Sequence, residues 1–293
     1  MTWFYEEPPP PAVSRGFYTL KGIDMAKRKS FKRVVAIADL HCGHRSGLTP
    51  PAWQWARDTG YRATDKFGIL QHEMWQWYVS ALTPLRPIDL LIVVGDAVDG
   101  KGSRSGGTEL ITSDRNVQVD MAAKCIKLAR ADRYAMVRGT GYHVGQDDDW
   151  EDQIAGQLQC PIGDHEWYKV NGVTFDVKHH VGSSTIPHGR ATTILRDTLW
   201  NALWAEVEEQ PRADIFLRAH VHYLLAVSGV RLNPWVAMTL PALQGQGTKW
   251  GARRMSGHVQ VGLAHYDITP SGDWTWQPHV ARLQAQKARA LTF

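Results

Sequence analysis

The chain has 293 residues, a 43% hydrophobic composition and a formal net charge of +4. These values predict a globular protein with a sizeable core, and no run approaches the roughly 20 apolar residues of a membrane helix. The N-terminus lacks the basic start and apolar run of a secretory signal, so we expect a cytoplasmic location. The small net charge does not indicate a dedicated nucleic-acid binder, and three widely spaced cysteines exclude a disulfide framework.

The chain is expected to have three parts. Residues 1–30 are Pro-rich and then polar and basic, which predicts an N-terminal arm outside the core. A main domain is expected over residues 31–283, with a helical insertion over residues 45–88. Residues 284–293 are expected to form a C-terminal tail.

Strands and helices alternate in the first half of the main domain. The apolar runs Val34–Ala38, Leu90–Val94 and Tyr134–Val137 predict buried strands. Apolar residues at spacings of three and four predict helices over residues 67–81 and 117–128. This alternation predicts a sheet with helices outside it.

The second half is richer in strands. Trp150–Leu158 is expected to be a helix, and Asn171-Gly172 between two β-forming runs predicts a hairpin. A long helical pattern opens at Pro187 and runs to about Glu209, with several leucines on one face. Further strands are expected over residues 215–217, 224–230, 235–240, 259–268 and 274–280.

Asp and His residues follow many of these strands directly. The motifs are Asp39-Leu40-His41, Gly95-Asp96-Ala97-Val98-Asp99, Gly139-Thr140-Gly141-Tyr142-His143, His179-His180 and His220-Val221-His222. The carboxyl ends of strands in an open α/β sheet meet at one edge, so these side chains should lie close together. Carboxylates and imidazoles crowded at one edge predict a metal site.

The order of these motifs resembles that of the calcineurin-like metallophosphoesterase superfamily. The family pattern is Asp-x-His, Gly-Asp-x-x-Asp, Gly-Asn-His, a single His after a strand, and Gly-His-x-His. The resemblance covers about residues 34–223. It implies an α/β fold, a four-layer αββα sandwich of two mixed β-sheets flanked by helices. It also implies two divalent metal ions as cofactors, with Mn favoured and Fe, Zn or Ni as alternatives.

The resemblance also implies a role for each matching residue. Asp39 and His41 would bind the first metal, together with His222 from the last motif. Asp96 would bridge the two metals, as a carboxylate can do between ions about 4 Å apart. Asp99 would hold a ligand or loop in place.

The second metal would be bound by His179 and His220. His180 is the alternative to His179, which we favour because the family ligand directly ends its strand. His180 and Arg190 are then candidates for substrate binding, and Arg218 is a further candidate for a phosphate contact.

The third motif departs from the family pattern. Thr140 stands where the family has the Asn that ligates the second metal, and His143 lies two residues later than the general-acid His. In one account Thr140 is a weak ligand or holds a water, and His143 protonates the leaving alkoxide. In the other account His143 itself binds the second metal. We favour the first.

The function implied by the resemblance is a dinuclear-metal-dependent phosphoesterase that hydrolyses phosphodiester bonds by attack of metal-bound hydroxide. The helical insertion resembles those of phage or prophage members of the superfamily, which favours DNA, RNA or nucleotides as substrates and no membrane partner. A small-molecule phosphatase or a cyclic-nucleotide phosphodiesterase is an alternative. A binding protein that keeps the fold without catalysis is a third interpretation.

Overall fold

A computed structural model describes most of the chain. The described residues are 30–55, 62–145, 149–229, 234–248, 251, 257–287, 290 and 292. The chain divides into residues 1–30 and residues 31–293, and every helix and strand described below belongs to the second unit. Apart from Ser30, the predicted arm lies outside the described residues. The insertion and the tail stay predictions.

The first sheet has six strands in the order β11-β10-β1-β2-β3-β4. Strands β1 to β4 run parallel, whereas β10 is antiparallel to β1 and β11 is antiparallel to β10. The bounds are Lys32–Ile37 for β1, Leu90–Val94 for β2, Tyr134–Val137 for β3, Ile162–Gly163 for β4, Gly262–Ile268 for β10 and Trp274–Val280 for β11.

The second sheet has five strands in the order β5-β6-β7-β9-β8. Its middle strands β6, β7 and β9 are parallel, and the edge strands β5 and β8 are antiparallel to their neighbours. The bounds are His165–Val170 for β5, Val173–Lys178 for β6, Ile215–Arg218 for β7, Leu225–Gly229 for β8 and Trp235–Thr239 for β9. The hairpin predicted around Asn171-Gly172 is the β5-β6 pair.

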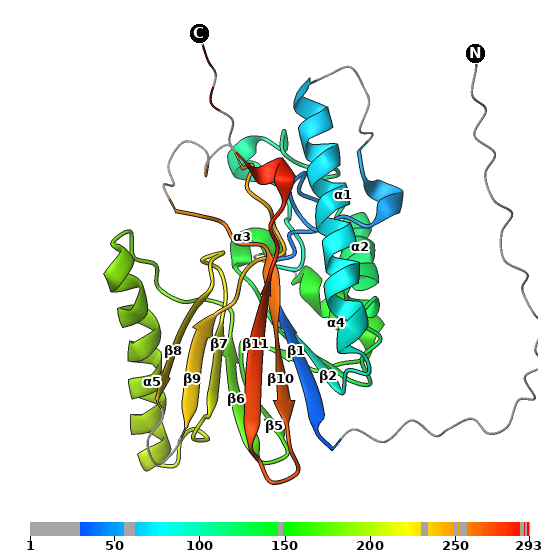
Figure 1. Cartoon of the computed structure of the whole chain (residues 1–293). Coiled ribbons are helices and arrows are strands. Elements are labelled where there is room, and N and C mark those ends of the chain that lie inside the picture. Colours follow the sequence, from blue (N-terminus) through cyan, green and yellow to red (C-terminus); the bar gives the residue numbers. More distant parts are fainter. Residues whose placement is uncertain are drawn as a thin grey trace, which may run out of the picture. The chain divides into compact units, whose positions relative to one another are not determined.

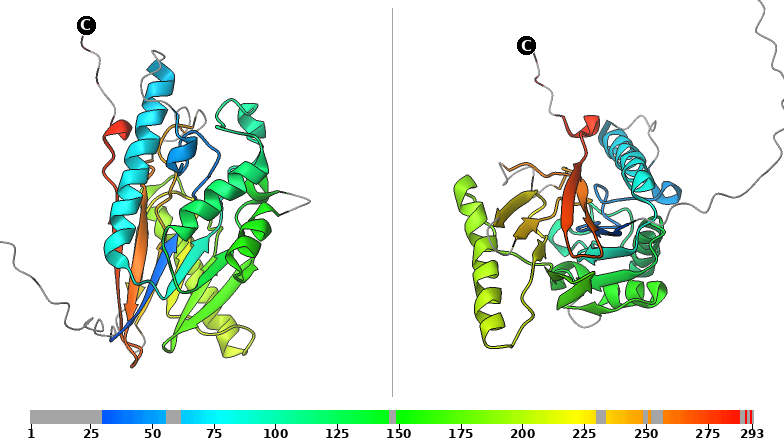
Figure 2. Two further views of the ribbon diagram at one scale, coloured as in Figure 1. Left: turned by 90° about the vertical axis from the view of Figure 1, so that its right-hand side faces the viewer. Right: turned by 60° about the horizontal axis from the view of Figure 1, so that its bottom comes forward.

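Helices cover the outer face of each sheet (Figures 1 and 2). On the first sheet lie α1 (Arg62–Leu82), α2 (Arg115–Lys127) and α4 (Trp150–Leu158); on the second lies α5 (Arg190–Glu206). A short helix, α3 (Gly141–Val144), follows β3. The 3₁₀ turns span Pro51–Trp53, Thr83–Leu85, Ser103–Ser105, Pro187–Gly189 and Gln284–Gln286. None of the described helices is both long and apolar enough to cross a membrane.

Side-chain alternation along the strands builds the layers. On β1, Val35 and Ile37 pack into a core shared with α1, α2 and α4, whereas Val34 and Ala36 pack between the two sheets. Strand side chains alternate between faces, so a strand buried on both faces reads as a continuous apolar run. The predicted four-layer αββα sandwich with two mixed sheets is confirmed.

Candidate metal centre

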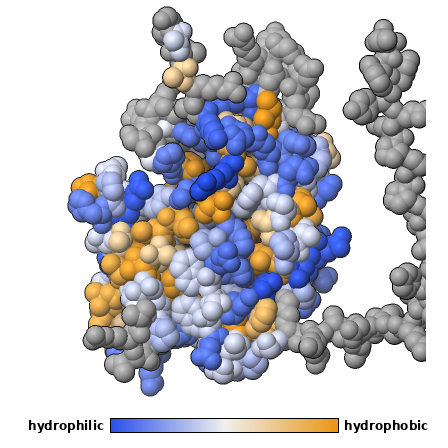
Figure 3. All heavy atoms as spheres, in the orientation of Figure 1, coloured by the Kyte–Doolittle hydropathy of each residue, from blue (hydrophilic) through white to orange (hydrophobic). Residues whose placement is uncertain are grey.

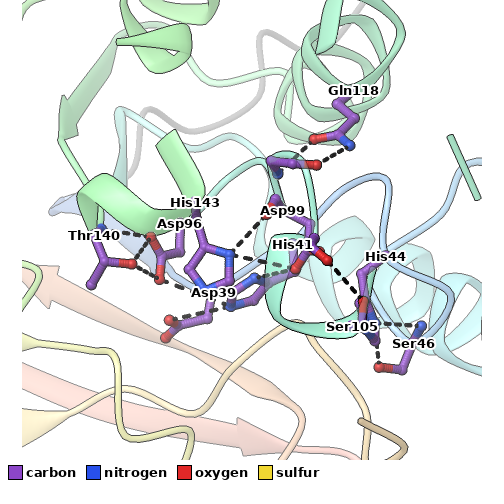
Figure 4. Close-up of polar contacts among 12 residues, drawn as sticks. Asp39, His41, His44, Ser46, Asp96, Asp99, Ser105, Gln118, Thr140 and His143 are labelled. Atoms are coloured by element: carbon purple, nitrogen blue, oxygen red, sulfur yellow. Dashed lines mark hydrogen bonds and ion pairs between the residues drawn. The ribbon is translucent and has the colours of Figure 1, made fainter. Parts of the chain in front are cut away.

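The Asp and His motifs meet at the carboxyl ends of strands from both sheets. Asp39, Asp96 and Thr140 follow β1, β2 and β3 of the first sheet; His179 and His220 follow β6 and β7 of the second. Figure 4 shows Asp39, His41, Asp96, Asp99, Thr140 and His143 gathered at this edge. The structure therefore brings together side chains that lie up to about 180 residues apart in the sequence.

One group consists of Asp39, His41 and His222, whose ligand atoms all lie within 4.8 Å of one another. His222 Nε2 lies 3.3 Å from Asp39 Oδ1 and 3.3 Å from His41 Nε2. Two imidazole nitrogens and a carboxylate oxygen that converge at this distance could hold a divalent metal ion.

Asp99 fixes the orientation of His41. The His41 Nδ1 atom lies 3.0 Å from Asp99 Oδ1, and an ionised carboxylate can only accept, so Nδ1–H donates and, in the neutral ring, Nε2 keeps its lone pair. Burial lowers the pKa of His41, but the Asp99, Asp96 and Asp39 carboxylates together outweigh burial and raise it. A carboxylate behind the far ring nitrogen is common for metal-binding histidines.

A second group consists of Asp96, His179 and His220, again within 4.8 Å. His179 Nδ1 lies 2.7 Å from the Val94 carbonyl oxygen, to which it must donate. In the neutral ring, His179 Nε2 then presents its lone pair 3.1 Å from Asp96 Oδ2. A cation between these two atoms, either the proton of a charged His179 ring or a metal ion, would suit both.

Two buried polar atoms at this edge have no hydrogen-bond partner among the described residues. They are Asp39 Oδ1 and His179 Nε2, which lie 3.9 Å apart. Leaving a buried polar atom without a partner costs about 1–3 kcal/mol, so such a pair points to a ligand. Oxygen and imidazole-nitrogen donors in this mixture fit Mn, Fe, Zn or Ni. The residues present thus fit a metal centre.

The position of His179 distinguishes it from His180. His179 is 2% exposed and faces Asp96, whereas His180 is exposed and its ring centroid lies 4.8 Å from that of His220. His180 is therefore placed at the rim of the group rather than inside it. The choice of His179 as the ligand stays a prediction that this geometry favours.

Asp96 and His179 shift each other's protonation strongly. Burial raises the pKa of Asp96, but the neighbouring histidines, His179 foremost, together outweigh burial and hold the pKa well below its usual range. Burial likewise lowers the pKa of His179, but the Asp96 and Asp39 carboxylates together with the Val94 carbonyl outweigh burial and raise the pKa to about 10. The side chains on their own therefore favour a positive charge next to Asp96, which is the charge that a metal ion would supply.

Thr140 contacts Asp96, whereas His143 contacts Asp99. The Thr140 hydroxyl lies 3.1 Å from each Asp96 carboxylate oxygen, and its backbone N–H donates to Asp96 Oδ1 at 2.7 Å. His143 Nδ1 lies 2.9 Å from the Asp99 carbonyl oxygen, and its ring meets that of His41 edge-on at 4.5 Å between centroids. His143 groups with His41 and Asp99 rather than with His179, which favours the first of the two accounts. Both roles stay predictions.

The backbone at the site is held in an unusual conformation. Nine non-glycine residues among those described have positive φ, and five are Asp39 (50°), His41 (45°), Asp96 (50°), His220 (72°) and His222 (55°). Left-handed conformations cost energy for side chains other than glycine, and they cluster at functional sites. Each of these residues ends or follows a strand, so the turn redirects its side chain into the centre.

Two glycines make room for the ligand groups. A Cβ on Gly139 would lie 2.1 Å from Asp96 Oδ1, and one on Gly95 would lie 2.6 Å from His179 Nδ1. Gly95 also has φ +72°. Both positions require glycine, because the loop backbone passes directly against Asp96 and His179.

Glu151 is a buried carboxylate near the centre that the sequence did not reveal. It lies in the first turn of α4, and its oxygens accept from the backbone N–H of Ala97 at 2.6 Å and of Gly139 at 2.7 Å. Burial raises the pKa of Glu151 to about 8, with a further contribution from Asp96. Glu151 ties together the loops that carry Asp96 and Thr140. Acidic residues at a helix start usually interact with that helix, so this inward role could not be predicted from the sequence.

Gln118 holds the loop after Asp99 in place, as Glu151 does for the loops that carry Asp96 and Thr140. Its amide exchanges hydrogen bonds with both the N–H and the C=O of Gly100, at 2.8 and 2.9 Å. The helix pattern places Gln118 on α2 but gives no indication that it reaches this loop.

The two arginines predicted to contact substrate, Arg190 and Arg218, have different surroundings. Arg190 stacks over the Tyr223 ring at 4.4 Å, next to His222, and its Nε is buried without a hydrogen-bond partner among the described residues; its substrate role stays a prediction. The prediction that Arg218 contacts phosphate is wrong. Arg218 is 1% exposed and pairs with Asp176 and Asp197, so no substrate can reach it.

No protein-family model and no curated protein matches this sequence. Solved structures match over most of the chain at low identity. Vps29 of Chaetomium thermophilum is 10% identical with a TM-score of 0.40, and the match covers 86% of this chain and 99% of that one. A dimetal phosphatase from Danio rerio is 10% identical with a TM-score of 0.36, and covers 84% and 98%.

Haemophilus influenzae NAD nucleotidase is 11% identical with a TM-score of 0.37; the match covers 90% of this chain but only 54% of that one. This chain therefore spans about half the length of that protein.

Proposed function

We propose that this protein is a two-metal phosphoesterase that hydrolyses phosphodiester bonds, with nucleic acid or nucleotides as substrates. The observation that carries the proposal is the pair of buried atoms, Asp39 Oδ1 and His179 Nε2, that converge without hydrogen-bond partners among the described residues. Asp96 lies between the two groups of possible ligands: its Oδ2 is 3.1 Å from His179 Nε2 and 4.0 Å from His41 Nε2. This position suits a bridging carboxylate.

The two proposed ligand sets follow the two groups. Asp39, His41 and His222 would hold one ion; His179 and His220 would hold the other, with Asp96 shared. Two bound ions would supply an activated water near neutral pH and positive charge for the phosphoryl oxygens. The protein's own part is to fix the ligand geometry, which Asp99 does for His41 and the Val94 carbonyl does for His179.

His143 is the proposed proton donor to the leaving oxygen. Burial and the neighbouring His41 lower the pKa of His143, so the ring is neutral before substrate arrives. A bound phosphate adds negative charge, which raises the pKa of a nearby imidazole and favours its protonation. Nδ1 is held by the Asp99 carbonyl, so Nε2 is the atom that would deliver the proton.

The preference for a diester rests on the motif resemblance, and a substrate panel tests it. Purified protein would be analysed for Mn, Fe, Zn and Ni, then assayed with Mn on a chromogenic diester, the matching monoester, cyclic nucleotides, DNA and RNA. We expect bound metal and hydrolysis of the diester and of nucleic acid. A faster rate on the monoester would instead identify a small-molecule phosphatase.

Asp96→Asn should abolish hydrolysis while the fold remains, because the amide cannot serve as a bridging anion. The matched control is Asp132→Asn, which changes an exposed Asp that belongs to none of the motifs. A wild-type rate in Asp96→Asn would disprove the bridging role. A protein that binds none of the four metals and stays inactive after reconstitution would overturn the enzyme proposal and favour a binding protein.

A further inference from the structure

The largest unexplained feature outside the metal centre is the outer face of α5. Among the described residues, nine large hydrophobic side chains are exposed, and seven lie on or beside this helix. They are Ile186, Leu195, Leu199, Trp200, Leu203, Trp204 and Val207, each 38 to 62% exposed. We call this set the α5 stripe. Figure 3 shows hydrophobic side chains gathering on the left of the face, along the position of α5 in Figure 1.

The opposite face of α5 is already packed against the second sheet. Ile194 is fully buried, and Asn201 donates to the Pro211 carbonyl and accepts from the Ala213 N–H. Asp197 accepts from Arg218 of β7 at 2.7 Å. These contacts fix which side of the helix faces outward, so the α5 stripe cannot turn inward without breaking them.

The α5 stripe is as large as the largest exposed apolar patch of a typical monomeric protein, and patches of that size are often functional. Trp200 and Trp204 are 53% and 44% exposed, which leaves about 200 Å² of aromatic surface, since an aromatic side chain carries roughly 150–250 Å². The aliphatic members bring the patch to the order of 500 Å², in the range where exposed patches mark interaction sites. A stable interface buries about 800 Å² per partner, and the stripe would supply more than half of that area before its polar rim is added.

The charges along α5 indicate which partner fits. Arg190 and Arg196 lie in the N-terminal half of α5, Glu206 ends the helix, and Glu208 and Glu209 follow it. Arg196 is exposed and has no acidic partner within ion-pair distance among the described residues. Among the residues that the structure describes, Glu206 pairs only with the exposed Arg212, at 3.4 Å, and exposed pairs of this kind contribute little.

We propose that the α5 stripe is an isologous dimer interface, in which two copies of this chain pair their α5 helices antiparallel. A two-fold axis at the level of Asn201 would set Leu199 opposite Leu203 and Leu195 opposite Val207. The same register sets Arg196 of one copy opposite Glu206 of the other, twice per dimer. In a two-fold interface the same patch must complement itself, and this helix does so in both apolar pattern and charge.

The first test is oligomeric state, measured by sedimentation and light scattering on the full chain. We expect a dimer at concentrations on the order of 100 µM or below, and loss of the dimer in Leu199→Glu. The matched control is Ile69→Glu, which places the same charge at an exposed apolar residue of α1 (40% exposed) and should leave the dimer intact. A monomeric wild type, or a dimer that persists in Leu199→Glu, overturns the proposal.

Charge reversal tests the register. Arg196→Glu and Glu206→Arg should each weaken self-association roughly tenfold or more, because like charges then face each other. An equimolar mixture of the two variants should regain the wild-type affinity, since both pairs in the mixed dimer are again opposite in charge. A mixture that stays as weak as the single variants would disprove this register.

A different occupant would give a different pattern. If residues 1–29 of the same chain covered the stripe, the wild type would be monomeric and a chain lacking them would associate; that result would overturn the proposal. Neither outcome depends on the metal centre. Leu199→Glu should keep the metal content and hydrolysis rate of the wild type, so a failure of this proposal is distinguishable from a failure of the proposed function.

Discussion

Two clusters of buried charges lie in this fold, and they are built in opposite ways. In the second sheet, Arg218 is 1% exposed and pairs with Asp176 Oδ1 and Asp197 Oδ2, each at 2.7 Å. Its guanidinium also donates to the carbonyl oxygens of Asp176 and Leu217. At the candidate metal centre, Asp39 Oδ1 and His179 Nε2 are buried without hydrogen-bond partners among the described residues.

The backbone shows the same contrast. Asp176 and Arg218 lie inside regular strands, whereas Asp39 and Asp96 have left-handed backbone angles. A charge cluster that only supports the fold satisfies its own members, because unpaired buried charges are costly. A cluster whose buried polar atoms lack hydrogen-bond partners, and whose backbone is strained, is organised to bind a ligand. The first cluster should therefore govern stability and the second activity.

The largest expected effect is on activity, from His179→Ala. Removing one ligand of a metal ion removes several kcal/mol of transition-state stabilisation, so hydrolysis should fall roughly 1,000-fold or more. His180→Ala is the matched control one residue later, at an exposed side chain, and should lose far less. The measurements are kcat/KM and metal content for each variant. A larger loss in His180→Ala would reverse the assignment of the ligand.

The second effect is on stability, from Arg218→Met. The variant leaves Asp176 and Asp197 without their shared cation, and breaking a buried pair on one side costs about 3–5 kcal/mol. Urea unfolding would measure the free energy, and metal analysis of the folded fraction would serve as the control. Normal stability with loss of bound metal would contradict the division between the two clusters.

The pH dependence of stability should show the same division. Burial raises the pKa of Asp176, but the hydrogen bond with His165 and the charge of Arg218 outweigh burial and lower it. A carboxyl whose pKa is depressed on folding stabilises the protein above its unfolded pKa of about 3.9, and loses that contribution as the pH falls through the folded value. The gap in unfolding free energy between wild type and Asp176→Asn should therefore narrow as the pH falls from about 5 to about 3. A gap that stays constant would show that Asp176 does not carry the charge.

Much of the fold could be predicted from the sequence, because it follows from local pattern. The apolar runs gave β2 and β3 with their observed bounds, and Trp150–Leu158 matches α4. The candidate site could also be predicted in outline, since an Asp or His directly after a strand must lie at the sheet edge.

What could not be predicted depends on contacts between distant residues. The sequence does not show that Glu151 reaches back to Ala97 and Gly139, nor that Arg218 is enclosed by β6 and α5. It places leucines on one face of the helix after Pro187, but burial follows Ile194 and Asn201 instead. A helical period identifies a face without indicating whether the sheet or a second molecule covers it.

The smallest expected effect comes from Thr140→Val, and it distinguishes two roles for the Thr140 hydroxyl, orienting Asp96 or ligating the second metal ion. The hydroxyl lies 3.1 Å from both Asp96 oxygens, where it can donate, and hydrogen bonds to charged groups contribute about 1.5–3 kcal/mol. If Thr140 acts by orienting Asp96, Thr140→Val should lower kcat roughly tenfold and keep two metals per chain, while Thr140→Ser restores the rate. If the hydroxyl instead ligates the second ion, Thr140→Val should bind that ion more weakly, and added metal should recover much of the activity. Metal titration of both variants separates the two, because an orienting hydrogen bond cannot be replaced by more metal.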